Sequence, residues 1–133
     1  MNDISEVVVA LIKNDAGKYL LINLANYYPS YDQHKDEWCP IAGHIRLGET
    51  AKQALIRESH EELAIEIEQI RQIARWGQDI PGETTVWWEV KIKSGEIKPN
   101  KKEVAKWGFF SAEEAKNLKL WPATRKFFDK FIW

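Results

Sequence analysis

The sequence predicts a mixed α/β sandwich. Apolar runs of strand length are interspersed with segments of helical periodicity, and turn residues separate the two kinds of segment. A chain of 133 residues is long enough for one hydrophobic core and too short for a two-domain enzyme. We therefore expect a single domain over residues 1–133.

The expected strands are apolar or alternating runs bounded by Gly, Pro, Asn or Asp. They cover residues 6–13, 19–24, 65–73, 84–93 and 104–110. The first two are expected to form a hairpin, and 65–73 is preferred as a strand over a prolongation of the preceding helix. Residues 25–37, 78–83 and 94–102 lack periodicity and are expected to be loops, and 38–48 is a short segment punctuated by Gly.

Three helices are expected from their starting residues. Thr50 is a suitable N-cap for a helix that continues to about Leu63. Ser111 is expected to cap a short helix, and Pro122 to open the terminal one.

The strand at 84–93 has two different faces. One face is apolar, and the other carries Trp87 among polar and charged residues. The apolar face consists of Val86, Trp88, Val90 and Ile92. Seven Trp in the whole chain can fill a core or offer rings on which bases stack, and composition does not choose between these uses.

Charge and composition restrict the kind of partner. Nineteen Lys and Arg against twenty Asp and Glu give a net charge of −1, so we expect no nucleic-acid polymer as the main partner. The apolar run Val7–Ile12 is too short for a signal peptide or a membrane span. Cys39 is the sole cysteine, which excludes an intramolecular disulfide and favours a cytoplasmic protein without a membrane partner.

Three glutamates interrupt the apolar stripe of the helix at 51–65. Glu58, Glu61 and Glu62 lie within roughly a 100° sector, where like charges repel each other. A hard divalent cation such as Mg²⁺ would turn this repulsion into shared attraction. The alternative is an acidic face exposed to solvent.

A longer pattern includes these glutamates. The residues from Gly43 to Ile65 resemble the Nudix box, G-x5-E-x7-R-E-U-x-E-E-x-G-U, in which U is a bulky aliphatic residue. The matching residues are Gly43, Glu49, Arg57, Glu58, Glu61, Glu62 and Ile65. Two positions depart from the pattern: Ser59 replaces an aliphatic residue, and Ala64 replaces a glycine at the end of the helix, where a left-handed conformation would cost Ala on the order of 1 kcal/mol.

The resemblance extends over nearly the whole chain and implies a Nudix-type α/β/α sandwich with a mixed central sheet. Residues 102–114 are similar to the closing strand and following helix of Nudix hydrolases. Residues 38–40 and the pair Gly43-His44 are similar to the branch that hydrolyses diadenosine tetraphosphate, although similar strings occur in the nucleoside triphosphate branch.

The resemblance also implies roles for individual residues. Mg²⁺ or Mn²⁺ would be held by Gly43, Glu58, Glu61 and Glu62. Arg57 would orient one of these glutamates. Glu49 would either contact the metal ligands without touching the metal or be a distant ligand itself. Its alternative role is to complement the helix dipole. Glu103 would be an additional ligand or the general base, and its alternative is a solvated loop residue. The implied catalytic set is Arg57, Glu58, Glu61, Glu62 and Glu103.

The implied function is that of a metal-dependent Nudix pyrophosphohydrolase. Water would attack phosphorus in a nucleoside diphosphate linked to a further group, with nucleoside triphosphates and dinucleoside polyphosphates as the leading substrates. The alternatives are a non-catalytic Nudix-fold module that binds a nucleotide or ADP-ribose, and an acidic helix that docks onto a protein. Candidates for contacts with a small-molecule nucleotide are Tyr28, Trp38, His44 and Trp87, and for each aromatic residue the alternative is packing in the core or on the surface.

Overall fold

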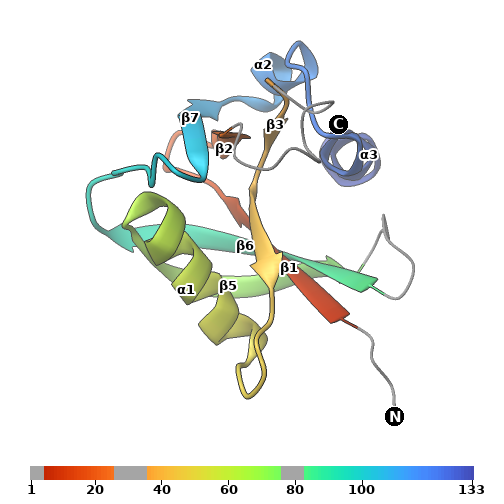
Figure 1. Cartoon of the computed structure of the whole chain (residues 1–133). Helices are drawn as coiled ribbons and strands as arrows, with labels where there is room; N and C mark the ends of the chain where they lie inside the picture. The colour runs from red at the N-terminus through yellow and green to blue at the C-terminus, as the bar shows by residue number, and fades with distance from the viewer. Residues whose placement is uncertain (1–4, 26–35, 76–82) are drawn as a thin grey trace.

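The computed structural model describes residues 5–25, 36–75 and 83–133. Along the chain its elements are β1 (Ser5–Ile12), β2 (Tyr19–Leu24), β3 (Trp38–Cys39), β4 (Ile41–His44), α1 (Ala51–Leu63), β5 (Glu66–Arg75), β6 (Glu83–Ser94), β7 (Val104–Phe110), α2 (Ala112–Lys116) and α3 (Pro122–Phe131) (Figure 1). No helix within these ranges is long and apolar enough to cross a membrane.

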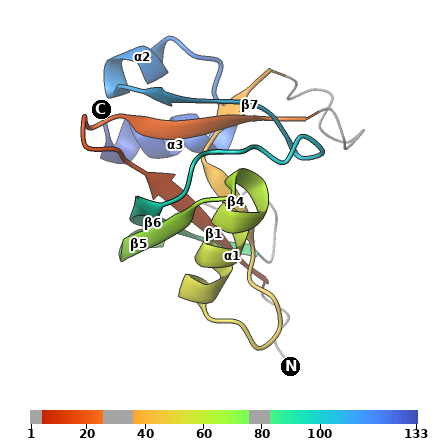
Figure 2. The ribbon, with the colours of Figure 1, turned by 90° about the vertical axis from the view of Figure 1, so that its left-hand side faces the viewer.

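The described strands form two sheets. The larger sheet has the order β4-β1-β6-β5, and the smaller has the order β3-β2-β7. In the larger sheet β1 runs parallel to β6 and antiparallel to β4, so the sheet is mixed, as expected. The smaller sheet is antiparallel throughout and lies beside the larger one (Figures 1 and 2).

Helices cover both faces of the larger sheet. Because side chains alternate along a strand, β1 sends Val8, Ala10 and Ile12 to one face and Val9 and Leu11 to the other. The first set packs in a cluster with residues of α1, and the second packs in a cluster with residues of α2 and α3. Figure 2 shows α1 and α3 on opposite sides of this sheet. The predicted α/β/α sandwich is confirmed.

The ends of α1 follow the predicted signals. The Thr50 side chain accepts a hydrogen bond from the Gln53 backbone, and the Gln53 side chain accepts one from the Thr50 backbone. At the other end Ala64 adopts the left-handed conformation, with φ 59° and ψ 31°. This conformation is the one in which Ala is less stable than Gly by about 1 kcal/mol.

The other predicted helix starts and strands are also present, but one predicted pairing of strands is wrong. Ser111 caps α2 and Pro122 opens α3. The expected hairpin of β1 and β2 is wrong, because the two strands share only the isolated bridge between Lys13 and Tyr19 and belong to different sheets. Both edges of β1 are already occupied by β4 and β6, so β2 pairs with β3 and β7 instead.

Two short strands were not expected. The segment 38–48 contains β3 and β4, which have only two and four residues and therefore show little alternation. Of the expected loops, most of 25–37 and of 78–83 lies outside the described residues.

Candidate functional site

The site is built on the connection from β4 to α1. Its loop is fixed by hydrogen bonds: the Ile45 N–H donates to the Glu6 carbonyl at 3.0 Å, and the Glu49 N–H donates to the Arg46 carbonyl at 3.0 Å. The Arg46 N–H in turn donates to Glu49 Oε1 at 3.0 Å. Gly48 has φ 80°, a conformation that favours glycine, and it closes this turn. The start of α1 is therefore fixed relative to β4.

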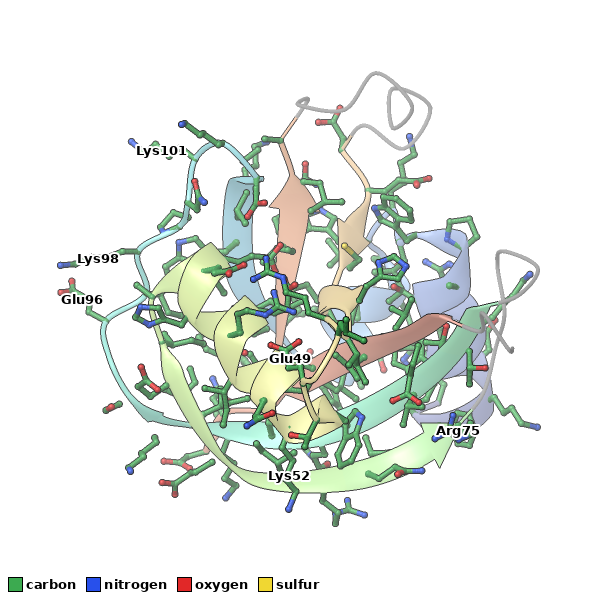
Figure 3. The ribbon with its side chains drawn as sticks, turned by 60° about the horizontal axis from the view of Figure 1, so that its bottom comes forward. Glu49, Lys52, Arg75, Glu96, Lys98 and Lys101 are labelled. Carbon is green, nitrogen blue, oxygen red and sulfur yellow. The ribbon has the colours of Figure 1, made fainter. Side chains whose placement is uncertain are left out.

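Arg57 connects the loop to the helix. Its Nε donates to Glu49 Oε2 at 2.7 Å and its Nη2 to Glu49 Oε1 at 2.9 Å, which is a bidentate contact. Its Nη1 donates to Glu58 Oε1 at 2.8 Å, and its Nη2 also reaches the His44 carbonyl at 3.1 Å. Figure 3 labels Glu49 beside the start of α1. One guanidinium thus holds β4, the loop and the helix together.

These contacts shift the pKa values of both partners. Hydrogen bonds from Arg57, and then from the Arg46 backbone, lower the pKa of Glu49 to about 2. The hydrogen bond to Glu49 raises the pKa of Arg57 further above its usual range. Glu49 and Arg57 therefore both stay charged, and remain an ion pair, throughout the pH range in which proteins usually function.

Glu58 lies directly against the backbone of β4. A Cβ added at Gly43 would overlap the Glu58 carboxyl group and would come within 2.8 Å of its Cγ. Only glycine at position 43 lets the carboxylate come this close to the strand. Burial raises the pKa of Glu58 although Arg57 opposes the shift.

Glu62 is the most buried of the three helix glutamates. It is 7% exposed, and its Oε2 is buried without a hydrogen-bond partner among the described residues. Burial, followed by the charges of Glu58, Glu103 and Glu61, raises the pKa of Glu62 to about 8. A buried carboxylate among other carboxylates is costly unless a cation compensates it. These residues therefore fit a divalent cation, which prefers carboxylate oxygens.

Glu61 and Glu103 border this group. The Glu61 side chain is 41% exposed, and its oxygens lie 3.5 Å from Arg57 Nη1 and 3.7 Å from Arg46 Nη2. Glu103 follows a loop that is bound to the end of α1, because the Asn100 N–H donates to the Glu62 carbonyl at 2.8 Å. Glu103 is close enough for its charge to raise the pKa values of Glu58 and Glu62.

The carboxylates do not converge on one point as they stand. In the described part of the chain, no three His, Cys, Asp or Glu side chains are grouped closely enough to hold a metal ion. The reason is visible in their pairing: Arg57 binds Glu58, and Arg46 lies beside Glu61.

The predicted substrate contacts have different surroundings. Tyr28 lies outside the described residues, and His44 is exposed at the end of β4. Trp38 pairs with Asn23, and its ring meets Phe110 with centroids 5.0 Å apart, on the opposite face of the small sheet from Cys39. The His44 carbonyl accepts a hydrogen bond from Arg57 Nη2 at 3.1 Å, which ties this residue to α1.

The interpretation of Trp87 as a stacking residue is wrong. Its ring is 3% exposed and stacks on Phe127, with centroids 3.9 Å apart and planes 11° apart. α3 packs over the part of this face of β6 that carries Trp87, whereas Lys91 and Lys93 on the same face are exposed. The alternative use of the Trp87 ring in the core is therefore the correct one. No surface of the ring is free for a base.

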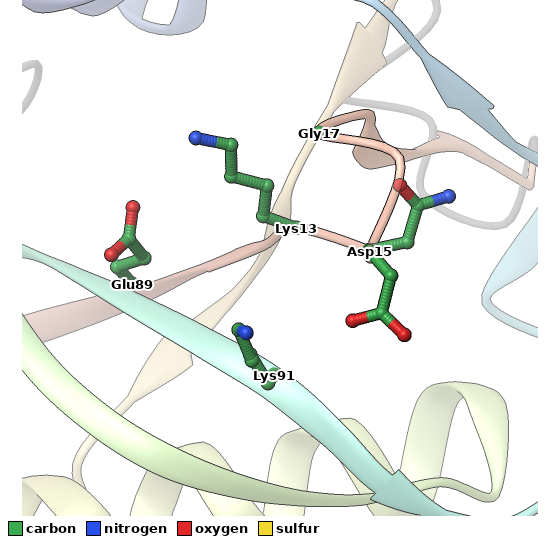
Figure 4. A pocket seen from close by; sticks show the side chains of 6 residues that line it. Lys13, Asp15, Gly17, Glu89 and Lys91 are labelled. Atoms are coloured by element: carbon green, nitrogen blue, oxygen red, sulfur yellow. The ribbon is translucent and has the colours of Figure 1, made fainter.

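Two further features bear on the extent of the site. Cys39 packs against the apolar cluster that contains Leu55 and Leu63 of α1, and burial, followed by the charge of Glu62, raises the pKa of its thiol; the sequence analysis considered Cys39 only for a disulfide. A cavity of about 390 Å³ lies elsewhere, between the β1–β2 turn and β6 (Figure 4). It is lined by Lys13, Asn14, Asp15, Gly17, Glu89 and Lys91, none of which belongs to the predicted site.

Comparisons with known proteins identify the family. A family model described as the NUDIX domain matches residues 4–131. The NAD-capped RNA hydrolase NudC of Haemophilus influenzae is 30% identical over 93 residues, which are 70% of this chain and 35% of that protein. The match thus spans about a third of the length of this relative.

Solved structures share the fold. The solution structure of the Escherichia coli ORF135 protein has a TM-score of 0.76 at 26% identity and covers 98% of this chain and 90% of that one. The structure of an ADP-ribose pyrophosphatase from Streptococcus suis has a TM-score of 0.71 at 23% identity. The match covers 91% of this chain and 82% of that one.

Proposed function

This chain belongs to the NUDIX domain family, and on that premise we propose that it is a divalent-metal-dependent pyrophosphohydrolase. Its substrate would be a nucleoside diphosphate linked to a further group, cleaved by attack of water on phosphorus. The observation that carries the proposal is the buried Glu62 carboxylate, which has an unpaired oxygen and lies among the charges of Glu58, Glu61 and Glu103.

The residues proposed to hold the cation are the Gly43 carbonyl and the carboxylates of Glu58, Glu61 and Glu62. The absence of a side chain at Gly43 and the burial of Glu62 support this set. When bound, Mg²⁺ or Mn²⁺ supplies positive charge to the phosphoryl oxygens and makes water more acidic. Arg57 is proposed to orient Glu58, since it donates to Glu58 Oε1 while it is itself held by Glu49.

Glu103 is proposed as a further ligand or as the group that accepts the proton of the attacking water. Its support is its position: it follows the loop that is bonded to the end of α1, and its charge acts on both Glu58 and Glu62. The Glu103 carbonyl accepts a hydrogen bond from the Ala25 N–H at 2.9 Å, so the backbone at this position is fixed. A proton acceptor must be positioned before its pKa becomes useful.

Nucleoside triphosphates and dinucleoside polyphosphates are the proposed substrates. The similar proteins include an NAD-capped RNA hydrolase and an ADP-ribose pyrophosphatase, so NAD and ADP-ribose are further compounds to test. Specificity resides in parts of a fold that differ between relatives, so fold alone does not choose among these compounds. The single cysteine, Cys39, supports a cytoplasmic location.

The test is a panel of compounds incubated with the protein and Mg²⁺, with EDTA as the matched control. The panel contains nucleoside triphosphates, dinucleoside polyphosphates, ADP-ribose and NAD. We expect metal-dependent cleavage of at least one of them, measured by separation of the products. Absence of cleavage across the panel would refute the proposed function.

Binding measurements separate the two other candidate functions. A thermal shift with Mg²⁺ should raise the Tm by mass action if the carboxylates hold the cation, whereas an acidic docking helix without a metal site gives no shift. A metal-dependent shift together with tight nucleotide binding and no product would instead favour the non-catalytic module.

A further inference from the structure

Two buried polar groups of α1 lack a hydrogen-bond partner, and they are neighbours. Ser59 is completely buried, and its Oγ has no partner among the described residues. Glu62 Oε2 is also buried without a partner. Residues three positions apart in a helix have Cβ atoms about 5–6 Å apart. An unused donor and an unused acceptor thus lie one helical turn from each other.

The position of Glu62 around the helix explains why one of its oxygens is buried. At about 100° per residue, Glu62 lies between Glu58 on the charged side and Ser59 on the apolar side of α1. Ser59 belongs to the buried face, together with Ala54, Leu55 and Leu63. The carboxylate therefore bridges the charged and the apolar surfaces of the helix, with Ser59 as its neighbour on the apolar side.

Residue 59 is the position at which this chain departs from an apolar side chain on the buried face of α1. The Nudix box has a bulky aliphatic residue at this position, whereas this chain buries a hydroxyl there. A buried hydroxyl without a partner destabilises a protein, and a buried carboxylate oxygen without a donor does so more strongly. A hydrogen bond between the Ser59 hydroxyl and a Glu62 carboxyl oxygen removes both penalties at once.

We propose that Ser59 is a positioning residue whose hydroxyl donates a hydrogen bond to Glu62 Oε2, either directly after rotation about χ1 or through one buried water. This bond fixes the inner oxygen of Glu62 and leaves the other oxygen to bind the cation. Only this last step rests on the proposed function, since the hydrogen bond itself needs no metal. Outer-sphere partners of this kind orient metal ligands and strengthen metal binding.

Cys39 is the competing donor. Cys39 packs against the apolar cluster that contains Leu55 and Leu63 of α1, and the charge of Glu62 contributes to the raised pKa of its thiol. A thiol is a weak donor, whereas a hydroxyl is a strong one. The Cys39→Ala variant therefore serves as the comparison for Ser59→Ala.

The first test is a double-mutant cycle on metal-free protein in EDTA, with the Tm as the readout. Ser59→Ala should lower the Tm by about 5 °C with Glu62 intact and should not lower it in the Glu62→Leu background, where no acceptor remains. In the Glu61→Gln background the loss should be unchanged, because Glu61 is on another side of the helix. Additive effects of Ser59 and Glu62 would overturn the proposal, as would coupling of Glu62 to Cys39 alone.

The second test compares two side chains of the same shape. Ser59→Thr keeps the hydroxyl and Ser59→Val replaces it with a methyl group, so their difference isolates the hydrogen bond. Calorimetric titration with Mn²⁺ should show affinity within about threefold of the original for Thr and a loss of about tenfold for Val. Equal losses of Mn²⁺ affinity in the two variants would overturn the proposal. If Ser59→Val does not fold, Ser59→Ala takes its place in the comparison.

The two tests separate this proposal from the proposed function. If the protein cleaves no compound of the panel, the cycle in metal-free protein still decides whether Ser59 and Glu62 are bonded. If cleavage is observed but the cycle is additive, the hydrolase function stands and Ser59 has no positioning role.

Discussion

The two helical layers on the larger sheet use their side chains in opposite ways. On the side of α3, aromatic rings fill the interior: Trp87 stacks on Phe127, and Tyr19 meets Phe128 edge-on with centroids 5.4 Å apart. On the side of α1, Glu62 is buried with an unpaired oxygen and a pKa raised to about 8. One layer stabilises the fold, whereas the other contains a group that destabilises the metal-free protein.

This difference indicates where function is located. Buried aromatic rings contribute apolar burial and favourable ring contacts. Buried like charges reduce stability, and proteins retain such groups at sites where a ligand compensates them. The contrast between the layers can be tested by changing one residue in each.

The largest expected effect is on activity and belongs to the α1 layer. Glu62→Gln keeps the size of the side chain and removes its charge, so we expect the turnover of whichever substrate the panel identifies to fall at least about a hundredfold. The rate of product formation under saturating Mg²⁺ measures this fall in turnover. Glu113→Gln, the same change on exposed α2, should retain full activity. A Glu62→Gln rate close to that of the unaltered protein would remove Glu62 from the proposed metal site.

The next effect is on stability and belongs to the α3 layer. Phe127→Ala removes a fully buried ring that stacks on Trp87, and we expect it to lower the free energy of unfolding by about 4 kcal/mol. Chemical denaturation measures this loss. Phe131 is 40% exposed on the same helix, so Phe131→Ala should cost much less. Equal losses would show that the two positions are packed alike.

A smaller effect on stability, of opposite sign, is expected for Glu62 in the absence of metal. Below pH 4.5 the side chain is protonated in both the folded and the unfolded chain. Between pH 4.5 and about 8 the unfolded chain releases this proton while the folded chain keeps it, so stability falls as the pH rises. Glu62→Gln cannot ionise and should be more stable than the unaltered protein by an amount that grows through this window.

Denaturation in EDTA at pH 5 and at pH 8.5 measures that difference. We expect almost no gain for Glu62→Gln at the lower pH and a clear gain at the higher pH. A gain that is equal at both values would mean that the charge of Glu62 is not what destabilises this layer.

The smallest effect concerns the end of α1. Ala64 has φ 59°, and Ala64→Gly should raise the free energy of unfolding by about 1 kcal/mol because glycine adopts this conformation without strain. Ala51→Gly, in the first turn of the same helix, should instead lower it by about as much. If both changes lower the stability, the side chain of Ala64 contributes more by packing than it loses by strain.

Local signals in the sequence predicted most of the elements. The caps at Thr50 and Ser111 and the proline at 122 mark helix starts through backbone hydrogen bonds that depend on nearby residues only. The spacing of the carboxylates along α1 likewise brought Glu58 and Glu62 to one side of the helix, because helical geometry fixes that relation.

Relations between distant segments could not be predicted in this way. The pairing of β1 with β4 and β6 depends on segments far along the chain, so the turn at 14–17 wrongly indicated a hairpin. Alternation in β6 shows that its two faces differ, but not that α3 packs against the polar face at Trp87 and buries this ring. Nor does the sequence reveal that Cys39 packs against the apolar cluster that α1 shares, since β3 and α1 are not adjacent in the sequence.

The parallel pairing of β1 with β6 has a consequence for how this protein is made. Val8 lies opposite Val86, so β1 cannot complete its pairing until β6, which is synthesised later, has left the ribosome. Closing so long a loop is slow, and until it closes an apolar, β-prone segment keeps one edge open. We expect translation products that stop before Glu83 to aggregate or to be bound by chaperones, even when they contain the entire stretch from Gly43 to Ile65.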